Sequence, residues 1–146
     1  MNFEKDRIFH VYNQGNNRKK IFLSRSNYQL FHKKMDRFIC PYADILAWCL
    51  MPNHFHLMIL VKEVELFYEK KSKMLLNTSE IVNKSMCKKR ALNESIGIML
   101  RSYTRIINAE NEFTGSLFRK RSKANVINSF KGLQPNFWKS KIAIFN

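Results

Sequence analysis

Apolar side chains along this chain follow two periods, one typical of strands and one typical of helices. The strand pattern, rich in β-branched and aromatic residues, covers five segments: residues 7–14, 19–23, 43–50, 55–61 and 116–127. Met51-Pro52-Asn53 suits a tight turn, so it predicts a hairpin of 43–50 with 55–61. Both of these runs are almost continuously apolar, which predicts two central strands. The last segment is rich in Lys and Arg, which predicts an edge strand.

Helical spacing occurs in two further segments. A helix is predicted over residues 26–39, capped by Ser24 or Ser26, and a second over 94–109, capped by Asn93. Their apolar stripes are Tyr28, Phe31, Met35 and Phe38 in the first, and Ile96, Met99, Leu100, Tyr103 and Ile107 in the second. Hairpins joined to helices in this order predict an α+β fold, a two-layer sandwich with the helices on one face of an antiparallel sheet.

The chain has 146 residues, the usual size of one domain. Residues 62–92 are rich in Lys and predict a basic connection with a short helix near 79–90, either a solvated insertion or a DNA contact. Beyond residue 128 the pattern fades. We therefore expect one domain over 1–127, with the basic insertion inside it, and a divergent or truncated tail over 128–146.

Charge points to a polyanionic partner. The sequence holds 26 Lys and Arg against 11 Asp and Glu, a formal charge of +15, and such a surplus favours nucleic acid over a basic surface with no specific partner. The three cysteines have no CxxC spacing, so they predict neither a disulfide framework nor a zinc cluster, and Cys49 is expected in the core. No apolar run predicts a signal peptide or a membrane span, so we expect a cytoplasmic protein.

His54 and His56 are the main candidates for chemistry. In a strand, residues two apart project to the same face, so both imidazoles would lie together, opposite Phe55 and Leu57. An isolated His-x-His pair is more often structural than metal-binding. Neutral imidazoles suit Mn²⁺ or Zn²⁺ better than Mg²⁺, and a divalent ion held by this pair would polarise a phosphate.

A known family shares these features. Residues 49–58, Cys-Leu-Met-Pro-Asn-His-Phe-His-Leu-Met, resemble the HUH motif of the single-tyrosine transposases, in particular the REP-associated tyrosine transposases. Residues 10–22 resemble the opening strand and turn of that family. Residues 103–108 and 114–118 resemble its later helix and strand. The resemblance covers about residues 7–124, in order.

The resemblance implies a protein with a ferredoxin-like fold. Such a protein would form a homodimer and nick single-stranded DNA at a hairpin-bearing end. In this family a tyrosine hydroxyl attacks the phosphate and forms a phosphotyrosine link. His54, His56 and a third polar residue would hold Mg²⁺ or Mn²⁺. The family nucleophile lies on a helix beyond the strand that resembles residues 114–118, but this chain has no tyrosine after Tyr103. Tyr103 is therefore the substitute candidate, although its apolar stripe favours a core role.

Basic residues near the predicted first turn and last strand are the candidate DNA contacts. They are Arg18, Lys19, Lys20, Arg119, Arg121 and Lys123, accompanied by Lys120. Phe113, Phe118 and Trp138 are candidates for base stacking. Three functions are therefore open: a DNA-processing transposase, impaired by the missing tyrosine; a DNA-binding module without chemistry; and a basic RNA-binding protein whose histidines are structural.

Overall fold

The computed structural model describes residues 1–75 and 81–127, with side chains placed outside 69–86. Its elements, in chain order, are β1 (Ile8–Gln14), a 3-10 turn η1 (Asn16–Arg18), α1 (Arg25–Phe38), β2 (Ala43–Met51), β3 (His54–Val61), β4 (Glu65–Leu75), β5 (Ile81–Ala91), α2 (Leu92–Asn111) and β6 (Lys123–Val126).

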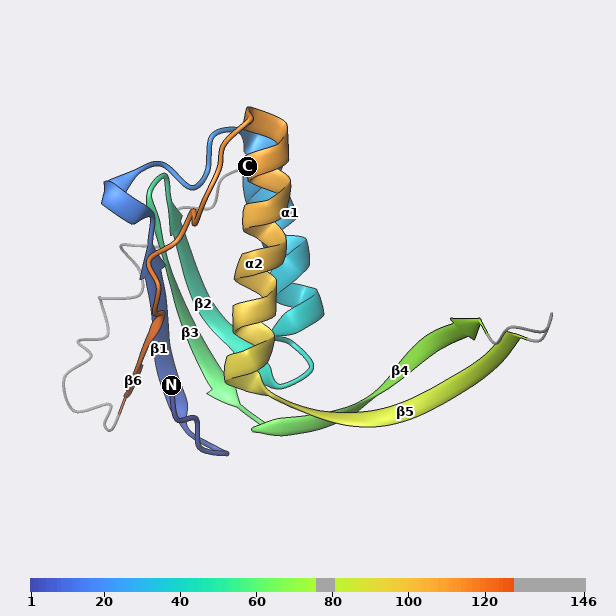
Figure 1. Cartoon of the computed structure of the whole chain (residues 1–146). Helices are drawn as coiled ribbons and strands as arrows, with labels where there is room; N and C mark the ends of the chain where they lie inside the picture. The colour runs from blue at the N-terminus through green and yellow to red at the C-terminus, as the bar shows by residue number, and fades with distance from the viewer. Residues whose placement is uncertain (76–80, 128–146) are drawn as a thin grey trace.

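Four of the strands form one antiparallel sheet in the order β2-β3-β1-β6, and both helices cover the same face of it (Figure 1). The order β1-α1-β2-β3-α2-β6, with β1 and β3 in the centre, is the ferredoxin-like arrangement. The α+β two-layer sandwich is therefore confirmed. β4 and β5 form a separate two-stranded ribbon between β3 and α2 that projects away from the sandwich (Figure 1).

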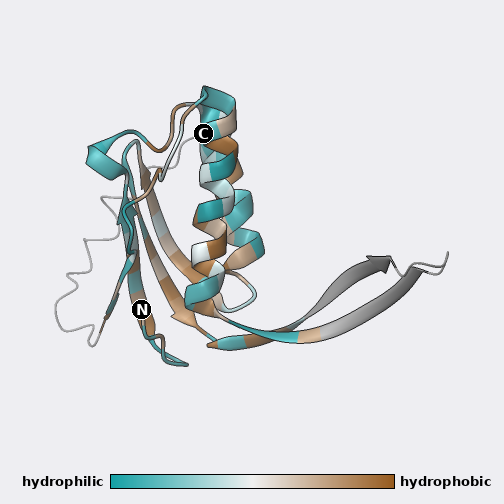
Figure 2. Cartoon of the chain, viewed as in Figure 1, coloured by the Kyte–Doolittle hydropathy of each residue, from teal (hydrophilic) through white to brown (hydrophobic). Residues whose placement is uncertain are grey.

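The core lies between the sheet and the helices. Alternate residues of β1 and β3 are buried, as period-two patterning requires, and their partners are Phe31 and Met35 of α1 and the buried stripe of α2. Figure 2 shows the contrast between the apolar strand β3 and the hydrophilic turn η1. Five aromatic rings, Phe22, Phe31, Phe55, Tyr103 and Phe118, meet in this core, each within 6.4 Å of at least one other.

The helix starts agree only in part with the sequence. Ser24, one of the two predicted caps, caps α1 in a capping box with Asn27. Asn93 does not cap α2, because that helix begins at Leu92 with Ala91 as its N-cap and no side-chain cap. β5 runs directly into the helix, and the Leu92 amide donates to the carbonyl of Val64 instead.

Three strand and helix predictions were wrong. Residues 19–23 form no strand, because Ile21 and Phe22 both donate their amides to the carbonyl of Pro52. β2 is an edge strand, because in the described sheet it pairs with β3 alone. A helix was expected near 79–90. The described residues of that range belong to β5 (81–91), which pairs along its whole length with β4 and is not helical.

The last strand is shorter than the predicted 116–127. Only Lys123–Val126 pair with β1, where they form the predicted edge strand. Residues before it form a loop, which includes an isolated bridge of Phe118 to Gly15. The tail over 128–146 lies outside the described residues. Among the described helices, none is long and apolar enough to cross a membrane.

Candidate nucleic-acid interface

The site is the face of the sheet that the helices leave open. β1 presents His10 and Tyr12 there, and β3 presents His54 and His56, all half-buried. The strand register sets Tyr12 opposite His56. The prediction that His54 and His56 share a face opposite the buried Phe55 and Leu57 is confirmed.

Each histidine of the pair is held by a neighbour through its Nδ1 atom. His54 Nδ1 lies 2.6 Å from Asn53 Oδ1, and His56 Nδ1 lies 2.7 Å from His10 Nε2. The rings of His10 and His56 are within 14° of parallel with centroids 4.9 Å apart, so with nitrogens 2.7 Å apart they meet edge to edge. The rings of His54 and His56 are 5.1 Å apart and nearly perpendicular, at 89°.

These contacts restrict the proton positions on the rings. Asn53 Oδ1 is an acceptor, so His54 donates its Nδ1–H and carries its lone pair on Nε2. Burial lowers the pKa of His10, which is therefore neutral at pH 7. One proton then lies between His10 and His56. When His56 donates it from Nδ1, the lone pair of His56 is also on Nε2.

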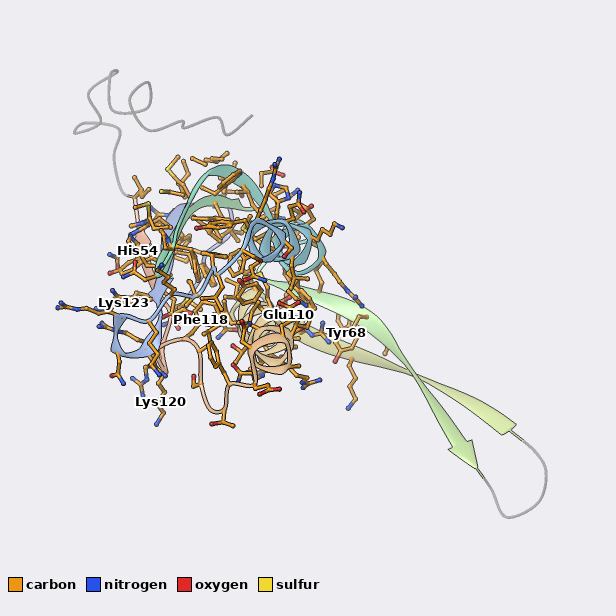
Figure 3. The ribbon with its side chains drawn as sticks, turned by 90° about the horizontal axis from the view of Figure 1, so that it is seen from above. His54, Tyr68, Glu110, Phe118, Lys120 and Lys123 are labelled. Atoms are coloured by element: carbon orange, nitrogen blue, oxygen red, sulfur yellow. The ribbon has the colours of Figure 1, made fainter. Side chains whose placement is uncertain are left out.

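A pocket of about 230 Å³ brings the histidines together with basic residues. It is lined by Tyr12, Asn13, Gln14, His54, His56, Arg119, Arg121 and Lys123. Lys123 lies beside His54 on the side of the sheet away from the helices (Figure 3). No carboxylate lines this histidine pocket among the described residues, so its field is strongly positive and suits a phosphate.

The loop that carries Arg119 and Arg121 is fixed to β1. The Arg119 amide donates to the carbonyl of Gln14 at 2.9 Å, and the buried Asn13 side chain donates to Ser122 Oγ at 2.9 Å. Gly15 allows the close approach of a different segment, the one after η1, since a Cβ there would lie 2.2 Å from the carbonyl oxygen of Lys19. Phe118 anchors the loop in the core, where it is 4% exposed.

The predicted DNA contacts Arg18, Lys19 and Lys20 lie outside the histidine pocket. All three are exposed, in or just after η1, and the amides of Gly15 and Ile21 tie this segment to the carbonyls of the turn before His54. They therefore extend the positive surface at the His54 end of the sheet, but they do not line the histidine pocket.

The structure also places the other candidates. Tyr103 is fully buried, and its hydroxyl donates to the carbonyl of Ile21 at 2.7 Å. Burial raises the pKa of Tyr103 far above its usual range. Phe118 is buried and Phe113 is half-exposed, whereas Trp138 lies outside the described residues. Cys49, expected in the core, is exposed on the open face opposite His56.

Tyr12 was not among the candidate site residues predicted from the sequence. Tyr12 lines the histidine pocket, and its ring centroid lies 5.6 Å from that of His56. The signal was available, because Tyr12 alternates with the buried Val11 and Asn13 in one strand.

The donor set fits a two-histidine metal site. Metal-binding histidines usually have the second ring nitrogen held by a hydrogen-bond partner, as Asn53 and His10 hold His54 and His56 here. Within residues 1–75 and 81–127 no group of three His, Cys, Asp or Glu side chains is arranged to hold a metal. Among the described residues His54 and His56 would be the protein ligands, and water or phosphate oxygens would have to fill the other coordination positions of the metal.

No family model matches the chain, and no curated protein matches its sequence. A solved structure does match: that of a REP-associated tyrosine transposase bound to a REP hairpin, with a TM-score of 0.55 and 14% identity. The two proteins share a fold. The match covers 90% of this chain but 62% of the transposase chain.

Proposed function

We propose that this chain is a transposase-like protein that binds single-stranded or hairpin DNA on the open face of its sheet. The observation that carries the proposal is the histidine pocket, where His54 and His56 adjoin Arg119, Arg121 and Lys123 with no carboxylate among the described lining residues. The transposase of similar fold is bound to a DNA hairpin, which supports the same class of ligand here.

His54 and His56 would hold a divalent ion, Mg²⁺ or Mn²⁺. When bound, the ion would act as a Lewis acid toward a DNA phosphate. The basic side chains of the pocket would hold the neighbouring phosphates, and Asn13 would keep the loop of Arg119 and Arg121 in place. Three cations around a two-histidine site repel a metal ion when no DNA is bound. The metal should therefore bind the protein–DNA complex more tightly than the free protein, and DNA should bind the metal-loaded protein more tightly than the metal-free protein.

Strand cleavage needs a nucleophile near that ion. The Tyr103 hydroxyl is buried and hydrogen-bonded in the core, so it is not available to a phosphate. Tyr12 is the tyrosine that lines the histidine pocket among the described residues, yet it lies within a central strand. We therefore propose that this chain binds DNA and that its cleavage chemistry is impaired.

A covalent-adduct assay tests this function. We expect a labelled DNA hairpin with a single-stranded flank to bind the chain tightly in low salt with Mn²⁺, and to give little or no protein–DNA adduct. Efficient adduct formation would show that the chain is an active enzyme, and its loss in Tyr12→Phe, but not in Tyr28→Phe, would assign the nucleophile. Absence of DNA binding would contradict the proposed function.

The same protein preparation can distinguish DNA binding from the RNA-binding alternative. Transposase-like binding predicts a preference for the DNA hairpin over an RNA duplex of equal length, whereas the opposite preference would favour an RNA-binding protein with structural histidines. A homodimer also stays a proposal, which the mass of the free and DNA-bound protein in solution would test.

A further inference from the structure

A second and larger cavity lies between α2 and the loop that leads to β6. Its volume is about 670 Å³, within the usual range for ligand sites. Five cationic residues line it: Arg101, Arg105, Arg119, Lys120 and Arg121. No acidic side chain lines it among the described residues. We call this cavity the α2 groove.

The five cations of the α2 groove are exposed, and no ion pair in the described part of the chain involves any of them. Ion pairs of other described cations do occur, as between Lys5 and Glu63 and between Lys62 and Asp44. Uncompensated charge of one sign around a single cavity repels itself, and a polyanionic ligand would remove that repulsion.

Arg101 and Arg105 come from one face of the helix, since they are four residues apart. Gly97 makes room beside them, because a Cβ at that position would lie 3.3 Å from a guanidinium nitrogen of Arg101. The buried side chains of Leu100 and Phe118 also line the cavity. The α2 groove thus combines an apolar floor, suited to a sugar or base, with a cationic rim suited to phosphates.

The α2 groove and the histidine pocket lie on either side of the loop of Arg119 and Arg121. Asn13, Arg119 and Arg121 line both cavities. In Figure 3 Phe118 lies inside the molecule, whereas Lys120 and Lys123 point outward from successive parts of the same segment, with Lys123 on the His54 side. One ligand can therefore contact Arg119 and Arg121 while it extends into both cavities.

We infer that the α2 groove binds the continuation of the DNA strand that enters the histidine pocket. The strand would pass Arg119 and Arg121, and Arg101 and Arg105 would hold the backbone phosphates of its single-stranded flank. This inference rests on the proposed function, and it extends the DNA interface from the open face of the sheet to the helical layer.

The test compares DNA ligands with and without that flank. The double variant Arg101→Gln/Arg105→Gln should bind a hairpin with a long single-stranded flank about 10- to 30-fold more weakly in 0.1 M salt, as expected for two lost phosphate contacts. It should bind the same hairpin without a flank as the wild type does. The matched control is Arg25→Gln/Arg37→Gln, which removes two exposed charges from α1.

Three results would overturn the inference: an unchanged affinity for the flanked hairpin; an equal loss for flanked and unflanked hairpins; or an equal loss in the α1 control. A further arm uses a free mononucleotide. Tight mononucleotide binding that the double variant abolishes would make the α2 groove a separate nucleotide site and would also overturn it. If the wild type binds neither hairpin, the proposed function itself fails, which is a different result.

Discussion

Replacing Arg119, Arg121 and Lys123 together by glutamine is expected to lower the affinity for a DNA hairpin roughly 100-fold in 0.1 M salt. Each phosphate contact contributes about 0.7–0.9 to the slope of log affinity against log salt concentration. Three lost contacts reduce that slope by about 2–3, which corresponds to two or more decades of affinity between 1 M and 0.1 M salt. Titrations of wild type and variant over a salt series measure both quantities.

A charge-matched variant separates local contacts from the field of the whole protein. Arg25, Lys33 and Arg37 are exposed on α1, on the opposite side of the sheet, so their replacement by glutamine changes the net charge equally. We expect only a small loss in that variant. Equal losses in the two triple variants would contradict binding at the histidine pocket and would indicate a non-specific attraction by a chain of charge +15.

The double variant His54→Ala/His56→Ala is expected to lose Mn²⁺ binding in the presence of hairpin DNA, by more than the roughly 10- to 100-fold that loss of an outer hydrogen-bond partner costs. Both rings lie half-buried on the open face, so their removal leaves the core between sheet and helices intact. Titration of Mn²⁺ into the protein–DNA complex measures the affinity.

Two further measurements separate metal binding by the histidines from DNA binding. Asn53→Ala removes the partner of His54 Nδ1 and should weaken Mn²⁺ binding by about 10- to 100-fold without removing a ligand. DNA affinity in chelator should be the same for wild type and the double histidine variant. A double variant that binds Mn²⁺ as the wild type does would exclude the histidines as ligands.

The sequence predicted the features that depend on local period. Alternation along β3 fixed the shared face of His54 and His56, and the helical stripe fixed the burial of Phe31 and Met35. Ser24 was one of two predicted caps, with Ser26, because capping depends on residues close in the chain. In each case the determining residues are neighbours in the chain.

Features that depend on distant pairing were not predictable in this way. β5 was expected to be helical, but its strand form is fixed by its pairing with β4. Cys49 was expected in the core, but a register shift between Ile45 and Ala47 reverses the alternation of β2 and turns Cys49 to the open face. Likewise, no local pattern unites Arg101 and Arg105 with the loop of Arg119, which only the fold brings to one cavity.

The central claim is that His54 and His56 hold a divalent ion beside a DNA phosphate in the pocket of Arg119, Arg121 and Lys123. Paramagnetic Mn²⁺ broadens the ³¹P resonances of nearby phosphates, so a ³¹P spectrum of the hairpin complex tests it directly. We predict selective broadening of one or a few phosphates by substoichiometric Mn²⁺ in the wild type, and its loss in His54→Ala/His56→Ala. The same selective broadening in the double variant, or uniform broadening in both, would contradict the claim.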